Sequence, residues 1–387
     1  MKVAWICGLP NQVRIMGCGH EISPIKTAAW SWILGHLPPP PDLDLHILCP
    51  VVGLEAKQLD FEYLGVKWHC VRQERGEQFL LWRRILIKFR AIIGEVSPDI
   101  IHGWGGETGC AYLATLLSSK ALVGVQGLLR YFDDLLNCRP PTRLFPLLKW
   151  RLGRYIERKS YEQAFKCITE SNTSARALKD YYGRDGAEII PHPLRSLFLR
   201  GNTDSTRNRV EIRFLFLGSL EHRKGALDAV DAFMRASVRG SKLIMIGSGP
   251  LSGEIEPIIN KSDRRADVRM LGTCSVERIC EEMRSAHFFL LPSYGDTGPS
   301  ALKEAIAQGL YPICYDNSGP SEYLRLYCGT LVPTGDVDAL SCALVRCSER
   351  LDACLQDGYD ASVRIKCDLE PKAVWEKLRG VYGSVCG

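Results

Sequence analysis

Residues 290–319, LLPSYGDTGPSALKEAIAQGLYPICYDNSG, decide the fold of this chain. The apolar start predicts a buried strand. Gly298 and Pro299 suit the N-cap and the first position of a following helix, and Gly309 suits its end. A second apolar run, YPICY, then follows. A strand, a helix and another buried strand in this order are typical of a parallel sheet covered on both faces by helices.

The same alternation recurs along both halves of the chain. Six apolar runs punctuate the first 193 residues: KVAWICGLP, LDLHILCP, DIIHGW, ALVGVQG, KCITES and EIIPHP. Six more follow: RFLFLGS, KLIMIGSG, VRMLG, FFLLPSY, YPICYD and GTLVP. A polar stretch over 194–210 predicts a linker between two α/β domains. We expect Rossmann-like, doubly wound domains over 1–195 and 210–387 that face a cleft, and the C-terminal helix could pack back on the first domain.

Composition narrows the class of protein. The chain has 387 residues, of which 46% are hydrophobic and 24% are charged, and its net charge is only +5. No apolar run is long enough for a membrane-spanning helix, and polar residues interrupt the start where a secretory signal would need an apolar core. We therefore expect a cytoplasmic protein. No nucleic-acid partner is expected.

Metal and redox sites are not expected. The sixteen cysteines contain no CxxC pair, and Cys7, Cys49 and Cys314 lie in apolar strands, where reduced cysteine acts as a small hydrophobic residue. The acidic pairs Asp42/Asp44 and Asp133/Asp134 lack further ligands, so each would be a poor cage for a cation.

A candidate phosphate site lies early in the second domain. Residues 213–233, RFLFLGSLEHRKGALDAVDAF, predict a strand that ends at Gly218, a loop with Arg223 and Lys224, and a helix from about Ala226. Two cations beside a helix N-terminus suit a phosphate or diphosphate, although a solvated turn would look the same. Nearby, the KLIMIGSGPLSGE glycines have the wrong spacing for a dinucleotide fingerprint, which disfavours an NAD-dependent dehydrogenase.

The stretch 290–319 carries a second candidate site. The amides of Ser300 and Ala301 are free to meet an anion at the start of the helix. Asp296 stands in the preceding loop and Glu304 lies one turn inside the helix. Carboxylates beside a phosphate site are suited to accept hydrogen bonds from sugar hydroxyls. The alternative is an ordinary pair of solvated carboxylates.

The order of these motifs resembles a known family. FLGSLEHRKG, IGSGP, the stretch 290–319 and GTLVPTGD, which span most of 213–340, are similar to the C-terminal domain of the retaining glycosyltransferases of family 4, which have the GT-B fold. The resemblance is looser in the first domain, where it depends on IMGCGHE, PDIIHGW, ITESNTSARAL and IIPHP. It implies a nucleotide-sugar donor, a saccharide or lipid-linked acceptor, retention of configuration and no bound metal or other cofactor.

The resemblance also implies roles for particular residues. Glu304 would bind the ribose hydroxyls, Asp296 would lie by the donor hexose, and Lys224 with Arg223 would neutralise the leaving diphosphate. His102 would lie where sugar and acceptor meet. The remaining donor contacts would come from Gly17, Gly19, Ser219, Gly298, Ser300 and Ala301.

Three departures from the family pattern keep alternatives open. Residue 296 is Asp rather than Glu, residue 219 is Ser rather than the usual Arg, and Pro299 replaces a frequent glycine. They are compatible with an unusual donor or with a nucleotide-sugar-binding protein that lacks activity. An epimerase or a phosphorylase on a similar fold is another alternative. For a transferase, front-face attack without a protein nucleophile is our hypothesis, and a nucleophilic Asp296 is its alternative.

Two basic and apolar segments suggest a partner surface. Residues 79–93, FLLWRRILIKFRAII, contain no acid, and residues 139–159, RPPTRLFPLLKWRLGRYIERK, have seven cations and one acid. They could be helices packed on the first sheet with a solvated basic face. They could also contact an anionic membrane, and we predict peripheral association with its inner face.

Overall fold

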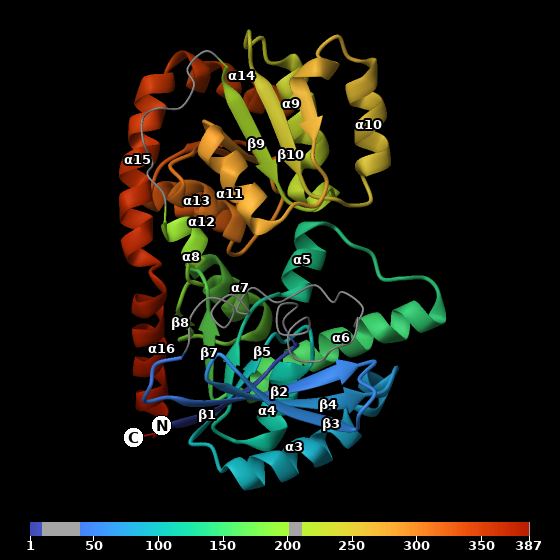
Figure 1. Ribbon diagram of the computed structural model, residues 1–387. Coiled ribbons are helices and arrows are strands. Elements are labelled where there is room, and N and C mark those ends of the chain that lie inside the picture. Colours follow the sequence, from blue (N-terminus) through green and yellow to red (C-terminus); the bar gives the residue numbers. More distant parts are fainter. Residues whose placement is uncertain (10–38, 201–210, 387) are drawn as a thin grey trace. The chain divides into compact units, whose positions relative to one another are not determined.

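The computed structural model describes residues 1–9, 39–200 and 211–386. The chain divides into two compact units (Figure 1). Unit 1 comprises Met1–Pro193 and Pro371–Gly387, and unit 2 comprises Leu194–Glu370. Each unit contains one largely parallel sheet between helices, which confirms the predicted α/β class. Within the described ranges, no helix is both long enough and apolar enough to cross a membrane.

Unit 1 is built on an eight-stranded sheet in the order β3-β4-β2-β1-β5-β6-β7-β8. Neighbouring strands are parallel except for β3, which runs antiparallel to β4. The strands are β1 Lys2–Ile6, β2 Asp44–Val52, β3 Gln58–Tyr63, β4 Val66–Gln73, β5 Ile100–Trp104, β6 Leu122–Gly124, β7 Lys166–Thr169 and β8 Glu188–Ile189. The helices are η1 Glu77–Leu80, α3 Arg83–Val96, α4 Cys110–Leu117, α5 Leu129–Leu135, α6 Leu144–Gln163, α7 Asn172–Tyr182 and α16 Pro371–Cys386.

Alternate residues of the central strand β1 enter two different core layers. Val3 and Trp5 pack in a cluster with α16, whereas Ala4 and Ile6 pack in a cluster with α3 and α4. This alternation is the two-residue period of a strand buried on both faces. The indole Nε1 of Trp5 donates a hydrogen bond to the Tyr382 hydroxyl at 2.7 Å, which joins the first strand of the chain to its last helix.

Unit 2 has a six-stranded, wholly parallel sheet in the order β11-β10-β9-β12-β13-β14. Its strands are β9 Arg213–Leu217, β10 Lys242–Ile246, β11 Val268–Met270, β12 Phe288–Leu291, β13 Tyr311–Tyr315 and β14 Thr330–Val332. Its helices are α8 Ser196–Leu199, η2 His222–Lys224, α9 Ala226–Arg235, α10 Ser252–Lys261, η3 Arg265–Asp267, α11 Val276–Ser285, α12 Ser300–Ala307, α13 Ser318–Leu326, α14 Val337–Glu349 and α15 Leu351–Asp368.

The twelve predicted apolar runs each contain a strand, but two strands and one boundary were missed. The hairpin β3–β4 lies at the sheet edge, where β3 is half exposed and carries polar residues at alternate positions. The expected linker was wrong over 194–200, because Leu194 and Phe198 are buried in the core of unit 2. The C-terminal helix α16 belongs to unit 1, as the sequence analysis allowed, so unit 2 ends at Glu370.

Candidate functional site

The candidate site of unit 2 forms where the strand order reverses direction, between β9 and β12. In doubly wound sheets the loops at the carboxyl ends of such strands diverge and leave room for a ligand. Lys224 follows β9 and Asp296 follows β12, and their side chains form an ion pair. The two side chains remain 18% and 13% exposed. The structure therefore brings together two of the predicted site residues, 72 positions apart in the chain.

A glycine allows the two loops to approach so closely. Gly225 has a φ of 65°, and a Cβ at this position would lie 1.8 Å from the carbonyl oxygen of Pro292. The loops are also joined by their backbones, because the Tyr294 amide donates to the Arg223 carbonyl at 2.8 Å. The glycine after Lys224 thus allows the contact between the β9 and β12 loops. The helix α9 begins directly after it, at the predicted Ala226.

Arg223 and Ser219 are both held by an acid that the sequence analysis did not single out. Glu221 Oε1 accepts hydrogen bonds from Ser219 Oγ at 2.9 Å and from Arg223 Nη2 at 3.0 Å. Arg223 Nη1 also donates to the Gly295 carbonyl at 3.0 Å. The Arg223 guanidinium therefore braces the loop that carries Asp296. The sequence feature that could have predicted this network is the acid two positions after Ser219 in the same loop.

A tyrosine pair fixes the β12 loop from its other side. The hydroxyls of Tyr294 and Tyr315 both donate to Asp228 Oδ2, at 2.8 and 2.6 Å. Burial and the neighbouring Asp228 carboxylate raise the pKa of Tyr294 to about 12, so its hydroxyl keeps its proton at neutral pH. Asp228 lies in α9, which therefore orients the residue two positions before Asp296.

The start of α12 differs by one residue from the prediction. The N-cap is Pro299 rather than Gly298, because the Pro299 backbone is extended at ψ 101° and its carbonyl accepts the amides of Leu302 and Lys303. Ser300 is thus the first helical residue. The helix has no side-chain cap, and the amides of Ser300 and Ala301 have no hydrogen-bond partner among the described residues. Gly309 follows the helix at φ 75°, as expected of its end.

Glu304 is buried and paired instead of open to solvent. Its side chain is 3% exposed, and its two oxygens accept from Arg195 Nε at 2.6 Å and Arg195 Nη2 at 2.7 Å. Burial raises the pKa of Glu304, and the guanidinium opposes that rise. Arg195 was missed, although a single cation in the apolar segment PLRSLF was a signal.

The KLIMIGSGP glycines serve packing. Gly247 has a φ of 135°, and a Cβ there would lie 1.9 Å from the Gly218 carbonyl oxygen. A Cβ at Gly249 would lie 2.4 Å from the Leu220 carbonyl oxygen. The glycines therefore let the loop after β10 contact the loop after β9. This agrees with the rejection of a dinucleotide fingerprint.

In unit 1, His102 does not have the placement expected of a catalytic residue. Its side chain is fully buried within β5, its ring stacks on Trp104 with centroids 4.1 Å apart, and its Nδ1 shares a hydrogen bond with the Tyr382 hydroxyl at 2.8 Å. Burial lowers the pKa of His102 to about 3, so the ring is neutral. The position supports a structural bridge between β5 and α16. The expected donor contacts Gly17 and Gly19 lie outside the described residues.

Two acidic side chains hold the loop after β6. Glu107 Oε2 accepts the Gly127 amide at 3.3 Å, and Glu157 Oε1 accepts the Leu129 amide at 2.6 Å. The Tyr182 hydroxyl donates to the other oxygen of Glu157. Desolvation raises the pKa of both glutamates to about 7. These partners are neutral donors, in contrast to the cations that face Asp296 and Glu304.

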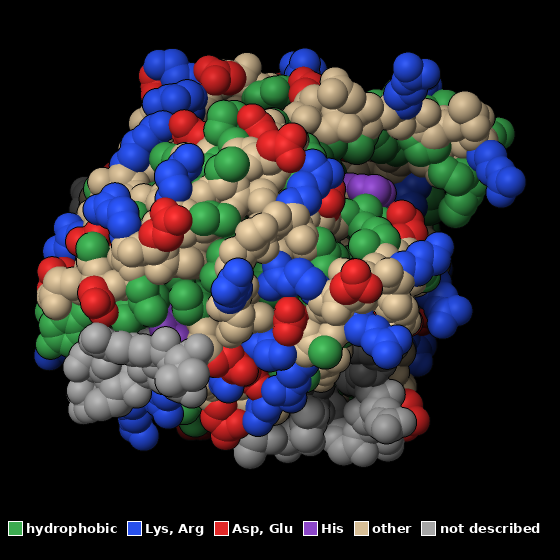
Figure 2. Space-filling view, turned by 90° about the horizontal axis from the view of Figure 1, so that it is seen from above, with side chains coloured by type: hydrophobic (Ala, Val, Ile, Leu, Met, Phe, Trp, Pro, Cys, Tyr) green, Lys and Arg blue, Asp and Glu red, His purple; other side chains and the backbone are tan. Residues whose placement is uncertain are grey.

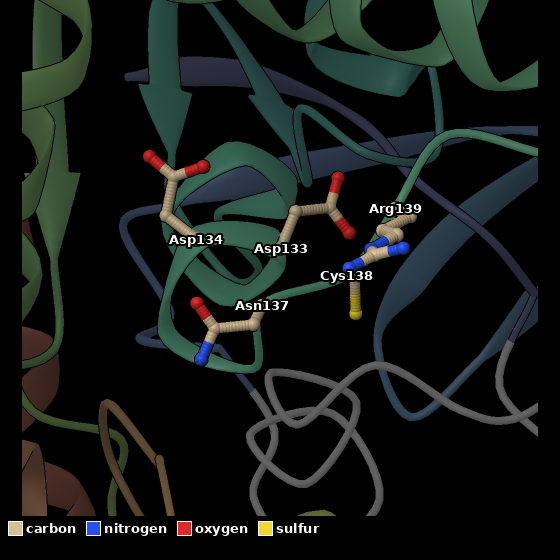
Figure 3. A pocket seen from close by; sticks show the side chains of 5 residues that line it. All are labelled: Asp133, Asp134, Asn137, Cys138 and Arg139. Carbon is tan, nitrogen blue, oxygen red and sulfur yellow. The ribbon is translucent and has the colours of Figure 1, made fainter.

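A hollow of about 590 Å³ lies beside α5 in unit 1. Its lining residues are Asp133, Asp134, Asn137, Cys138 and Arg139 (Figure 3). The carboxylates of Asp133 and Asp134 point in different directions (Figure 3), and Asp133 Oδ2 is bonded to Arg154. In the described part of the chain, no group of three or more His, Cys, Asp or Glu residues is placed to hold a metal ion.

Comparison with known proteins finds a family match over the part of unit 2 that holds the charged site. Residues 203–350 match the family model described as glycosyl transferases group 1. The matched residues lie within unit 2 and include Lys224, Asp296 and Glu304. A curated relative, the amylovoran biosynthesis glycosyltransferase AmsK of Erwinia amylovora, is 32% identical over 147 residues, and the match covers 36% of each chain. The match thus spans about a third of that relative's length.

Solved structures extend the likeness to both units. A sucrose-phosphate synthase from Thermosynechococcus elongatus has a TM-score of 0.75 at 16% identity and covers 100% of this chain and 99% of its own. Anabaena HepE in complex with UDP has a TM-score of 0.72 at 13% identity, with 99% of this chain and 100% of its own covered. At these identities the likeness establishes the fold. The chain has the predicted GT-B fold.

Proposed function

We propose that this protein is a retaining glycosyltransferase of family 4. In this proposal it moves a hexose from a nucleotide sugar to a hydroxyl of a saccharide or lipid-linked acceptor, in the synthesis of a cell-surface polysaccharide or glycolipid. The match to glycosyl transferases group 1 and the glycosyltransferase function of the AmsK relative support the reaction class. The HepE complex with UDP supports a nucleotide sugar as donor.

One observation carries the proposal. Lys224 and Asp296 meet at the reversal point of the unit 2 sheet, one short loop before the uncapped start of α12. A diphosphate there would meet a lysine ammonium and the free amides of Ser300 and Ala301, which together can stabilise the charge that develops on the leaving group. Asp296 then faces the transferred sugar, where it can accept hydroxyl hydrogen bonds and hold the Lys224 side chain.

The chemistry proposed for this site is front-face substitution. The bond between the anomeric carbon and the diphosphate oxygen breaks, and the acceptor oxygen forms its new bond on the same face. The acceptor proton passes to a phosphate oxygen. The protein supplies orientation and charge stabilisation, so no metal or organic cofactor is assigned a role. We place the reaction on the cytoplasmic side, at or near the inner face of the membrane.

Donor binding tests the proposal first. A thermal-shift panel of UDP, GDP, ADP and their sugars should identify a donor, since a ligand that binds the native state raises the melting temperature. That donor, labelled in its hexose, is then incubated with candidate saccharide acceptors. We expect a labelled product whose anomeric configuration is retained. Recovery of an isomerised nucleotide sugar would support an epimerase instead, and binding without any product would support a non-catalytic nucleotide-sugar-binding protein.

A further inference from the structure

The two basic and apolar segments of unit 1 have different environments. The apolar side of α3 is used inside the unit, because Ile85, Phe89, Ile92 and Val96 are buried. Its exposed side is basic and carries a single large apolar residue, Ile87, at 67% exposure. This is the arrangement of a helix that packs on a sheet and turns a solvated basic face outward.

The N-terminal half of α6 has no such packing. The first buried residue of this helix is Ile156, twelve positions after its start at Leu144. Figure 1 shows this end of α6 extending away from the sheet of unit 1. Three large apolar side chains on it are exposed: Leu144 at 72%, Phe145 at 65% and Leu148 at 47%. This helix end therefore offers apolar surface that the fold of unit 1 does not use.

The apolar surface continues onto η1. The rings of Phe79 and Phe145 lie 5.5 Å apart, and Phe79 and Leu80 are 38% and 56% exposed. We call Phe79, Leu80, Leu144, Phe145 and Leu148 the α6 tip. Single exposed hydrophobic residues are normal on a protein surface, but a contiguous group of this kind marks an interaction site.

The exposed charge on the N-terminal half of α6 is of one sign. Arg143, Lys149 and Arg151 are exposed along the same helix end, and residues 135–156 include no acid. Within the described residues, the ion pairs of α6 begin at Arg154, and none involves these three cations. Figure 2 shows green hydrophobic side chains beside blue Lys and Arg side chains at a projecting edge of the molecule.

We infer that the α6 tip docks on an anionic lipid bilayer, with its apolar side chains in the headgroup region and Arg143, Lys149 and Arg151 against the lipid phosphates. Aromatic and leucine side chains flanked by cations suit that interface, because apolar burial and attraction to anionic lipid add together. A second protein would need acids placed opposite three separate cations, whereas a bilayer offers negative charge everywhere. The inference narrows the membrane association proposed above to one surface and excludes α3 from it.

Flotation of the full chain with lipid vesicles tests this inference without any sugar donor, so its outcome is independent of transferase activity. The wild-type protein should float with vesicles of phosphatidylcholine and phosphatidylglycerol at low salt and remain unbound with phosphatidylcholine alone. Phe145→Ser should lower the partition coefficient about tenfold, since it removes one large apolar side chain from the interface. Ile87→Ser is the matched control on α3 and should leave partitioning unchanged.

The charge requirement is tested in the same way. Lys149→Gln should lower binding to the anionic vesicles about fivefold. The matched control, Arg90→Gln on α3, should have a much smaller effect. All four substituted side chains are exposed, so unchanged melting temperatures should show that the variants fold.

Several results would overturn the inference. They are the absence of wild-type flotation with anionic vesicles, equal binding to neutral vesicles, or an equal loss in the α3 variants. Light scattering supplies a further check, with equal molar mass expected for wild type and Phe145→Ser. A dimer that dissociates in Phe145→Ser, together with no vesicle binding, would assign the α6 tip to a second copy of the chain.

Discussion

The two units each bury a glutamate beside a loop at the sheet edge, and they do so in opposite ways. In unit 2, the two carboxylate oxygens of Glu304 accept hydrogen bonds from Nε and Nη2 of Arg195. In unit 1, Glu157 is fully buried and accepts hydrogen bonds from the Leu129 amide and the Tyr182 hydroxyl, which are neutral donors. A neutral site favours the protonated acid, and desolvation raises the pKa of Glu157 to about 7. The comparison shows that ion pairs hold the loops of unit 2. In unit 1, Glu157 holds its loop through neutral donors and can take up a proton near neutral pH.

The largest expected effect comes from separating the buried pair. Arg195→Ala leaves the Glu304 carboxylate buried without its cation, and we expect unit 2 to lose about 3–5 kcal/mol of stability. Urea unfolding measures this loss. The control is Arg325→Ala, which removes an exposed partner of Asp316 and should cost less than about 1 kcal/mol. Similar losses in both variants would mean that burial of Glu304 adds nothing to the strength of its pair.

The next effect concerns the second ion pair of unit 2, which is more accessible. Lys224→Ala should lower turnover at saturating donor about 100-fold, as expected for the loss of one electrostatic contact to the leaving group. Steady-state kinetics with the donor from the thermal-shift panel measures it. Lys261→Ala, an exposed lysine of α10, should leave turnover unchanged. Normal turnover in Lys224→Ala would remove this lysine from the site.

A smaller effect is the pH dependence of stability, which should distinguish Glu157 from Glu304. The folded-state pKa of Glu157, about 7, lies above its ordinary value of 4.5. The protonated acid therefore contributes stability that is fully present below pH 4.5 and is lost as the pH rises through 7. We expect a loss of about 2 kcal/mol over this range. Unfolding at several pH values should show a shallower decline in Glu157→Gln, and an identical decline would contradict the assignment.

The smallest effect distinguishes the two carboxylates of unit 2 from each other. Glu304→Gln should weaken binding of both free nucleotide and nucleotide sugar about tenfold, if Glu304 accepts ribose hydroxyls as the family resemblance implies. Asp296→Asn should leave free-nucleotide affinity nearly unchanged and lower turnover, because its contact matters mainly in the transition state. Calorimetric titration measures the affinities. Equal loss of free-nucleotide affinity in both variants would reject this division of roles.

Much of the fold and part of the site could be predicted from short stretches of sequence. Apolar runs with a two-residue or continuous pattern identified twelve strands, because the interior of a parallel sheet requires apolar residues on both faces. Lys224 and Asp296 were each predicted as site residues from their own loops, but their ion pair was not predicted, because it depends on β9 and β12 being neighbours in the sheet. The glycine after Lys224 was needed for the close approach to Pro292.

The sequence by itself determined the two α/β domains, the order in which their strands occur along the chain, and the charged loops of unit 2. These features depend on local patterns of polarity and turn residues. Only the tertiary structure decided which groups neutralise one another. Arg195 and Glu304 are 109 positions apart, and Trp5 and Tyr382 are 377 positions apart. Likewise, the burial of His102 depends on α16, which follows unit 2 in the chain and packs in unit 1. Burial and pairing are set by neighbours that are distant in sequence, so no local pattern could have predicted them.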